Sequence, residues 1–236
     1  MTFHIPSLVL AASYTIPLFT FSITYAISMN TPRLHKPFDG DVMWVYSGDY
    51  HLSTSISHGL ARRLGSLGLS IGAVLFLFVV LHKGAYMQAL LRKNPALKTK
   101  SKLWLVNLLL VAGISSSLFM IFVCCFPESE GLVLHLLFAL LYFGSNIAYQ
   151  LIHIAIDEIF SLDLKEPYLH GLRIWCSYSS IFCLVAVVVS LAVFDNMVLS
   201  SAFEILMTVF MLGFFSSLHY QYSHIQVHPY LIAIAE

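Results

Sequence analysis

Six long apolar runs, separated by short polar segments, make up most of this chain. Each run carries at most one Asp, Glu, Lys or Arg, and a helix needs about 20 apolar residues to cross a bilayer. The approximate bounds of the runs are 5–27, 64–85, 103–126, 131–156, 174–195 and 198–222. The longest polar stretch, at 28–63, leaves no room for a soluble domain. The pattern therefore predicts an all-α polytopic membrane protein, with six transmembrane helices in one bundle and a single domain over 1–236.

The first apolar run is predicted to be a retained span. Residues 1–30 contain no Lys or Arg, whereas a secretory signal begins with a basic region and has a shorter apolar segment. Pro6 and Pro17 also interrupt the run, so we expect a helix kinked near Pro17. Ser13, Thr20 and Thr24 are expected to face other helices, where their hydroxyls can bond.

The distribution of Lys and Arg predicts the orientation of the six spans. With six spans, both termini lie on one side, together with the second and fourth loops. That side holds eight of the twelve basic residues, and the other side, which includes the loop at 28–63, holds four. An excess of basic residues marks the cytosolic side, so both termini are expected in the cytosol and 28–63 is an outer loop. The basic loop at 83–102 is then either a topology determinant or a contact for anionic inner-leaflet lipid.

Composition agrees with a membrane protein and excludes some partners. Charged residues make up 10% of the chain, against about 25% in soluble domains. Twelve basic and twelve acidic residues cancel, and no basic tail is present, so no nucleic-acid partner is expected. The four cysteines fall within or at the edges of spans, which leaves no disulfide framework to infer.

The fourth span carries the most informative polar residues. Projected at about 100° per residue, they form one narrow stripe with a small residue among them: His135, Ala139, Tyr142, Asn146, Gln150, His153 and Asp157, with Tyr149 at its edge. Because polar groups in hydrocarbon are costly, the stripe should face the bundle interior. Two interpretations stay open. The stripe is either a set of interhelical hydrogen bonds or the wall of a polar cavity that admits water, an ion or a lipid headgroup.

Other spans carry fewer signals. Gly65, Gly68 and Gly72 are spaced for close helix packing. Asn107 is a polar-core candidate in the third span. Glu204 lies about one turn inside the outer end of the last span. It is either an interfacial carboxylate near a helix N-terminus or a functional carboxylate.

The sequence favours a protein without a cofactor, and a metal site is the weaker alternative. A haem-binding bundle would need histidines on neighbouring helices, and the third and fifth spans contain none. His153 and Asp157 are four residues apart, a spacing that lets two ligands share one metal. His82 and His219 are expected at similar depth, so zinc held by these four residues is the alternative cofactor.

The order of these features resembles a known family. It is the six-span group that contains the DNA-damage-regulated autophagy modulators, in a wider set with GPI-lipid-remodelling and phosphoinositide-kinase-scaffold membrane proteins. The resemblance covers nearly the whole chain. It is carried by Tyr46-Ser47-Gly48 in the outer loop, Asn107 and Gly113, then His135, Ala139, Phe143-Gly144, Tyr149 and Gln150, and finally Ser201-Ala202-Phe203-Glu204 and the aromatic run to Tyr222, Ser223 and Ile225.

The resemblance implies a non-enzymatic regulator or scaffold of endomembrane trafficking, autophagy or membrane-lipid organisation. It implies a lysosomal, endosomal, Golgi or plasma membrane location, and membrane-protein or lipid-kinase partners besides membrane lipids. His135, Gln150 and Glu204 would be its characteristic intramembrane polar groups. The alternatives are a membrane-embedded lipid-remodelling enzyme, with or without zinc, that uses the cytosolic-side His/Asp residues, and third a channel or transporter subunit.

Overall fold

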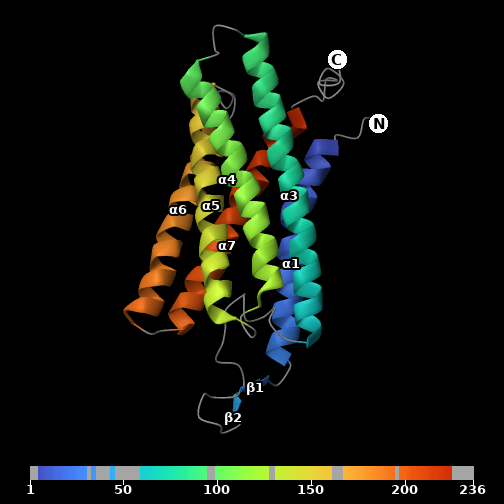
Figure 1. Ribbon diagram of the computed structural model, residues 1–236, viewed down its shortest axis with the longest axis vertical. Helices are drawn as coiled ribbons and strands as arrows, with labels where there is room; N and C mark the ends of the chain where they lie inside the picture. Colours follow the sequence, from blue (N-terminus) through green and yellow to red (C-terminus); the bar gives the residue numbers. More distant parts are fainter. Residues whose placement is uncertain are drawn as a thin grey trace.

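Each of the six predicted spans is a long helix in the computed structural model of the protein (Figure 1). The helices are α1 (Ile5–Asn30), α3 (Gly59–Lys93), α4 (Lys100–Cys125), α5 (Leu132–Ile159), α6 (Pro167–Ala192) and α7 (Met197–His224). All six are long and apolar enough to cross a membrane, which confirms the six-span prediction. Some extend beyond the apolar runs, as α6 does by starting at Pro167, because helical hydrogen bonding continues through polar turns at the membrane surface.

The structure describes residues 5–30, 33–35, 43–45, 59–94, 99–127, 131–160, 167–194 and 197–224. Most of the predicted outer loop, including 46–48, lies outside the described residues, as do 95–98 of the basic loop and Ile225. Within the outer loop, β1 (Arg33–His35) and β2 (Met43–Val45) form an antiparallel hairpin in which Leu34 faces Trp44.

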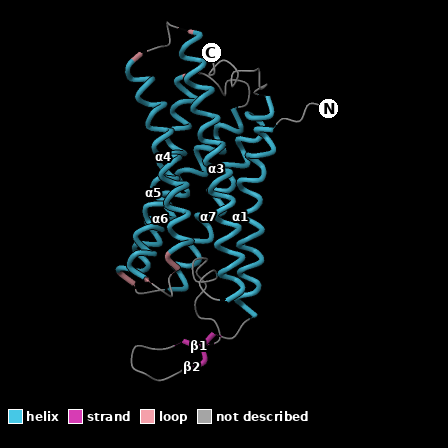
Figure 2. The backbone as a smooth tube through the Cα atoms, turned by 45° about the vertical axis from the view of Figure 1, so that its right-hand side comes forward, coloured by secondary structure: helices cyan, strands magenta, loops and turns pink. Residues whose placement is uncertain are grey.

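The helices run alternately up and down (Figures 1 and 2), and their contacts close them into a ring. Each helix packs against its two neighbours in the order α1, α3, α4, α5, α6, α7, and α7 returns to α1. We call the end where α1 begins and α7 ends the terminal end, at the top of Figure 1. The opposite end, next to β1 and β2, is the hairpin end.

Aromatic side chains fill much of the ring interior. Phe76 of α3 lies edge-on to both Tyr149 and Phe215, at ring-centroid distances of 5.2 and 4.8 Å. The outer faces are apolar as well: Phe19 is 65% exposed and Val133 is 80% exposed. Side chains of this kind on every outer face suit a lipid environment rather than water.

Two glycines let α3 approach α1 closely. A Cβ atom at Gly68 would overlap the Thr20 side chain, and one at Gly72 would overlap the Pro17 ring. Gly65, one turn before Gly68, is also buried. The small-residue stripe predicted for the second span therefore forms a helix-packing surface.

Candidate functional site

The polar stripe of the fourth span lies on the interior face of α5. Its polar side chains are at most 2% exposed at six positions: His135, Asn146, Tyr149, Gln150, His153 and Asp157. Tyr142 is half-buried. Because burial of polar groups is costly unless they bond, the partners of each group decide what the stripe does.

In the middle of the stripe, amide side chains join three helices. Asn146 Nδ2 donates to Ser116 Oγ of α4 over 3.2 Å. Gln150 Nε2 donates to Asn146 Oδ1 over 2.9 Å, and Ser177 Oγ of α6 donates to Gln150 Oε1 over 3.0 Å. This chain of bonds ties α4, α5 and α6 together, as the interhelical interpretation of the stripe predicts.

Near the terminal end, Asp157 lies at the centre of a buried charge cluster. Lys83 Nζ donates to its Oδ1 over 3.0 Å, and Arg173 Nη1 donates to its Oδ2 over 3.1 Å. Arg173 also donates from Nε to Ser217 Oγ over 3.2 Å and from Nη2 to the Ser217 carbonyl over 3.1 Å. This group, which we call the Asp157 cluster, links α3, α5 and α6 through one carboxylate, and Arg173 extends the link to α7.

His153 lies next to the Asp157 cluster, within ion-pair distance of its carboxylate. Its Nδ1 is 3.0 Å from Asp157 Oδ2, but neither ring nitrogen has a hydrogen-bond partner among the described residues. The ring packs edge-on to Phe214, with centroids 5.8 Å apart.

Lys83 and Arg173 are functional-site residues that the sequence analysis did not identify. In the sequence, Lys83 falls in the basic loop predicted at 83–102, and both residues contribute only to the predicted orientation. The structure corrects this, because both side chains are at most 1% exposed and bind Asp157. The depth of these two residues in the membrane could have identified them. Both lie at the same depth as Asp157 in a neighbouring span, and a buried carboxylate requires a cation or a proton.

Three other basic residues of the loop at 83–102 are exposed at the terminal end. Arg92, Lys93 and Lys100 are exposed, and Lys102 Nζ lies 5.2 Å from the ring centroid of Phe160. These side chains are placed to meet the aqueous or headgroup region rather than the bundle interior.

The structure does not bring the four zinc candidates together. His219 is exposed, and His82 is half-buried. Among the described residues, no three His, Cys, Asp or Glu side chains are placed to hold a metal ion. Of the four, only His153 and Asp157 lie side by side.

Asn107 is a correction to the predicted polar core. Its side chain is exposed on α4, because the face of α4 that enters the ring carries Val106, Leu109 and Gly113 instead. It lies two turns from the start of the helix, where a polar side chain can reach the interface.

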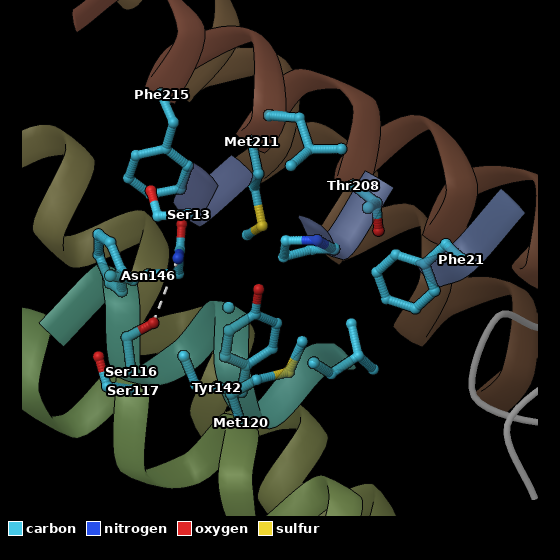
Figure 3. Close-up of a pocket in the computed structure, with 16 residues that line it drawn as sticks. Ser13, Phe21, Ser116, Ser117, Met120, Tyr142, Asn146, Thr208, Met211 and Phe215 are labelled. Carbon is cyan, nitrogen blue, oxygen red and sulfur yellow. Dashed lines mark hydrogen bonds between the residues drawn. The ribbon is translucent and has the colours of Figure 1, made fainter. Parts of the chain in front are cut away.

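Two small adjoining cavities lie inside the ring. The central cavity, of about 50 Å³, has six polar side chains in its lining: Ser13, Ser116, Ser117, Tyr142, Asn146 and Thr208. Figure 3 shows the Tyr142 hydroxyl directed into it and the Asn146–Ser116 hydrogen bond at its wall. The second, of about 40 Å³, lies toward the hairpin end, and His135, Tyr142, Glu204 and Thr208 line it. We call it the Glu204 cavity.

The interhelical bond of Ser177 provides a direct test of the stripe as a packing element. Ser177→Ala is expected to lower the free energy of unfolding by about 0.6 kcal/mol, up to about 1.7, the range for hydrogen bonds between membrane helices. Ser180→Ala is the matched control, because this equally buried hydroxyl donates only to the Cys176 carbonyl of its own helix. Thermal unfolding of both variants in the same detergent measures the difference, and equal stabilities would contradict the interpretation.

The comparisons with known proteins gave one finding. The family model described as Frag1/DRAM/Sfk1/Cwh43P N-terminal domain matches residues 6–225. No curated protein and no solved structure gave a significant match. The matched residues include all of α3 to α7 and all of α1 except its first residue.

Proposed function

The chain belongs to the Frag1/DRAM/Sfk1/Cwh43P N-terminal domain family, and from this membership we propose that it is a non-enzymatic membrane regulator or scaffold. It acts in endomembrane trafficking, autophagy or membrane-lipid organisation, and works without a cofactor. Its membrane is lysosomal, endosomal, Golgi or plasma membrane. Its partners are membrane lipids, together with membrane proteins or lipid kinases.

The observation that carries this proposal is how the interior polar groups are used. Gln150 joins α5 to α6 through Ser177, and Asn146 joins α5 to α4. Asp157 bonds to cations of α3 and α6. Polar groups that hold helices together support a structural role for the interior, so the activity of the protein would reside in its surfaces.

The exposed charges support an orientation with both termini in the cytosol. Arg92, Lys93 and Lys100 are exposed at the terminal end, and basic residues are more frequent on the cytosolic side of membrane proteins. In that orientation the same residues face the anionic inner leaflet, where each contributes about 1 kcal/mol of attraction near the surface. We therefore include anionic lipid among the proposed partners.

The proposal is tested with a tag placed after residue 236. In cells whose plasma membrane alone is permeabilised, an antibody is expected to reach this tag on endomembranes or on the inner face of the plasma membrane. Loss of the protein is expected to change autophagic flux or phosphoinositide distribution, and re-expression of the tagged protein is expected to restore it.

An activity assay on the purified protein distinguishes a scaffold from an enzyme. In liposomes that contain labelled phospholipid or GPI lipid, no turnover above protein-free liposomes is expected. Lipid turnover by the wild type that is lost in His153→Ala would overturn the non-enzymatic proposal. A tag that antibody reaches only after full permeabilisation would overturn the orientation.

A further inference from the structure

The Glu204 cavity and the central cavity form one continuous space inside the ring. They share part of their lining, namely Phe21, Leu69, Met120, Tyr142 and Thr208. Along α5 the lining extends from His135 to Asn146, which is about 16 Å at a rise of 1.5 Å per residue. The space therefore reaches from near the hairpin end to the middle of the bundle.

His135 has a ring nitrogen that the described part of the protein does not satisfy. Its Nδ1 lies 2.8 Å from the carbonyl oxygen of Phe126, and a carbonyl can only accept, so Nδ1 carries the hydrogen. In the neutral ring, Nε2 is then an acceptor. It is buried, and no described residue gives it a hydrogen bond. Because a buried acceptor without a partner is costly, a donor in the adjoining Glu204 cavity would be favoured.

The rest of the lining offers both acceptors and donors. Thr208 Oγ1 already donates to the Glu204 carbonyl over 3.0 Å. Ser13 Oγ donates to the Leu10 carbonyl over 2.7 Å. These two oxygens therefore present lone pairs to the cavities. The Tyr142 hydroxyl, which Figure 3 shows directed into the central cavity, is a donor as well as an acceptor.

A lining of mixed donors and acceptors selects a guest that can do both. We propose that the two cavities hold a continuous chain of ordered water molecules, from His135 Nε2 to the hydrogen bond between Asn146 and Ser116. Water donates to His135 Nε2 and accepts from the Tyr142 hydroxyl. A metal cation would use only the acceptors of this lining, and an anion only the donors.

The volume of the two cavities agrees with the length of such a chain. One water needs roughly 10–15 Å³ of space, so cavities of about 40 and 50 Å³ hold about three or four waters each. Hydrogen-bonded waters are about 2.8 Å apart, so about six of them span 16 Å. Organic ligands occupy pockets of about 300–1,000 Å³ and do not fit.

The water chain ends in the middle of the bundle. Phe76 and Phe215 line the side of the central cavity toward the Asp157 cluster, and their ring centroids are 4.8 Å apart. Neither Lys83 nor Asp157 lines either cavity. The half of the ring interior toward the hairpin end is therefore hydrated, while the aromatic rings separate its water from the ion pairs.

The test is hydroxyl-radical labelling of the purified protein by a short X-ray pulse, read by mass spectrometry. The pulse splits bound water in place, and the radicals oxidise nearby side chains, such as Met to its sulfoxide. Met207 and Met211 lie one turn apart on α7 and are 0% and 3% exposed, but only Met211 lines a cavity. Met211 is expected to be oxidised several-fold faster than Met207. Equal rates would mean that the space beside Met211 is dry and would overturn the proposal.

A radical scavenger in the buffer identifies the source of the radicals. It is expected to slow the labelling of Tyr168, which is 78% exposed, and to leave the labelling of Met211 nearly unchanged. Bound water produces its radicals beside Met211, where the scavenger does not reach. Equal protection of the two residues would mean that the radicals entered from bulk solvent, and the proposal would fail.

A variant connects the labelling to the lining of the cavities. Tyr142→Phe removes the hydroxyl that donates to the chain, and it is expected to slow the oxidation of Met211 several-fold. Tyr178→Phe is the matched control, because this tyrosine is 63% exposed on the outer face of α6, and it should leave Met211 unchanged. Equal oxidation of Met211 in the two variants contradicts the role of Tyr142. If Tyr142→Phe does not fold, the comparison of Met211 with Met207 in the wild type decides.

Discussion

Asp157→Asn is expected to lower the free energy of unfolding by about 3–5 kcal/mol, the range for removing one partner of a buried ion pair. The substitution takes away the carboxylate to which both Lys83 and Arg173 donate. The two cations stay nearly inaccessible to solvent, at 0% and 1% exposure, so hydration cannot replace the lost charge. Thermal unfolding followed by tryptophan fluorescence measures the loss, since the chain holds three Trp residues.

The next residue in the chain supplies the control for this prediction. Glu158 is exposed and forms an ion pair of 3.1 Å with His170, and exposed pairs contribute about 0–1 kcal/mol. Glu158→Gln should therefore leave stability nearly unchanged. Adding Lys83→Met to Asp157→Asn should recover part of the loss, because it removes one buried charge. If Asp157→Asn is no less stable than Glu158→Gln, the Asp157 cluster does not hold the four helices together.

The number of spans could be predicted from the sequence because charge is so costly in hydrocarbon that six apolar runs must each be a helix. The order of helices in the ring could not be predicted. Most spans are apolar on the face toward lipid as well as on the face toward the core: Phe78 is 59% exposed and Phe76 is 7% exposed on the same helix. With no contrast between these faces, a single sequence does not show which helices meet.

The fourth span is the exception, because its polar stripe does distinguish its faces. Its interior orientation follows from the periodicity of the stripe, and the structure places Asn146, Gln150 and Asp157 in the interior. The residues that bond to the stripe could not be predicted in this way. Ser177 and Arg173 come from α6, and nothing in the spacing of residues within one helix shows which residues of another helix lie opposite.

Charges near helix ends were ambiguous for a physical reason. A Lys or Arg within a few residues of a span boundary can extend to the headgroups or turn inward to an acid, and the sequence is the same in both cases. Arg92 extends outward and Lys83 turns inward, on the same helix. Asn107 was predicted to enter the core but is exposed. A polar residue inside a predicted span therefore need not face the interior.

The close approach of α1 and α3 makes Gly72 sensitive to substitution. Gly72→Ala is expected to lower the free energy of unfolding by about 1–3 kcal/mol, the range for overpacking a tight interior. The added methyl group would overlap Cγ of Pro17, and a proline ring cannot rotate away because it is closed onto its own backbone. The two helices would have to separate instead, which weakens the wall of the central cavity that Pro17 and Gly72 form together.

Gly144→Ala is the matched control, because the same methyl group at this helical glycine of α5 has no atom within 4 Å. There the substitution should raise stability by about 0.8–1.0 kcal/mol through helix propensity alone. The two variants change the same atoms and differ only in what the new methyl group meets, so opposite signs in thermal unfolding isolate the helix contact. If Gly72→Ala stabilises the protein as much as Gly144→Ala does, α1 does not pack against α3 at this distance. The central cavity would then lack the wall that α1 gives it.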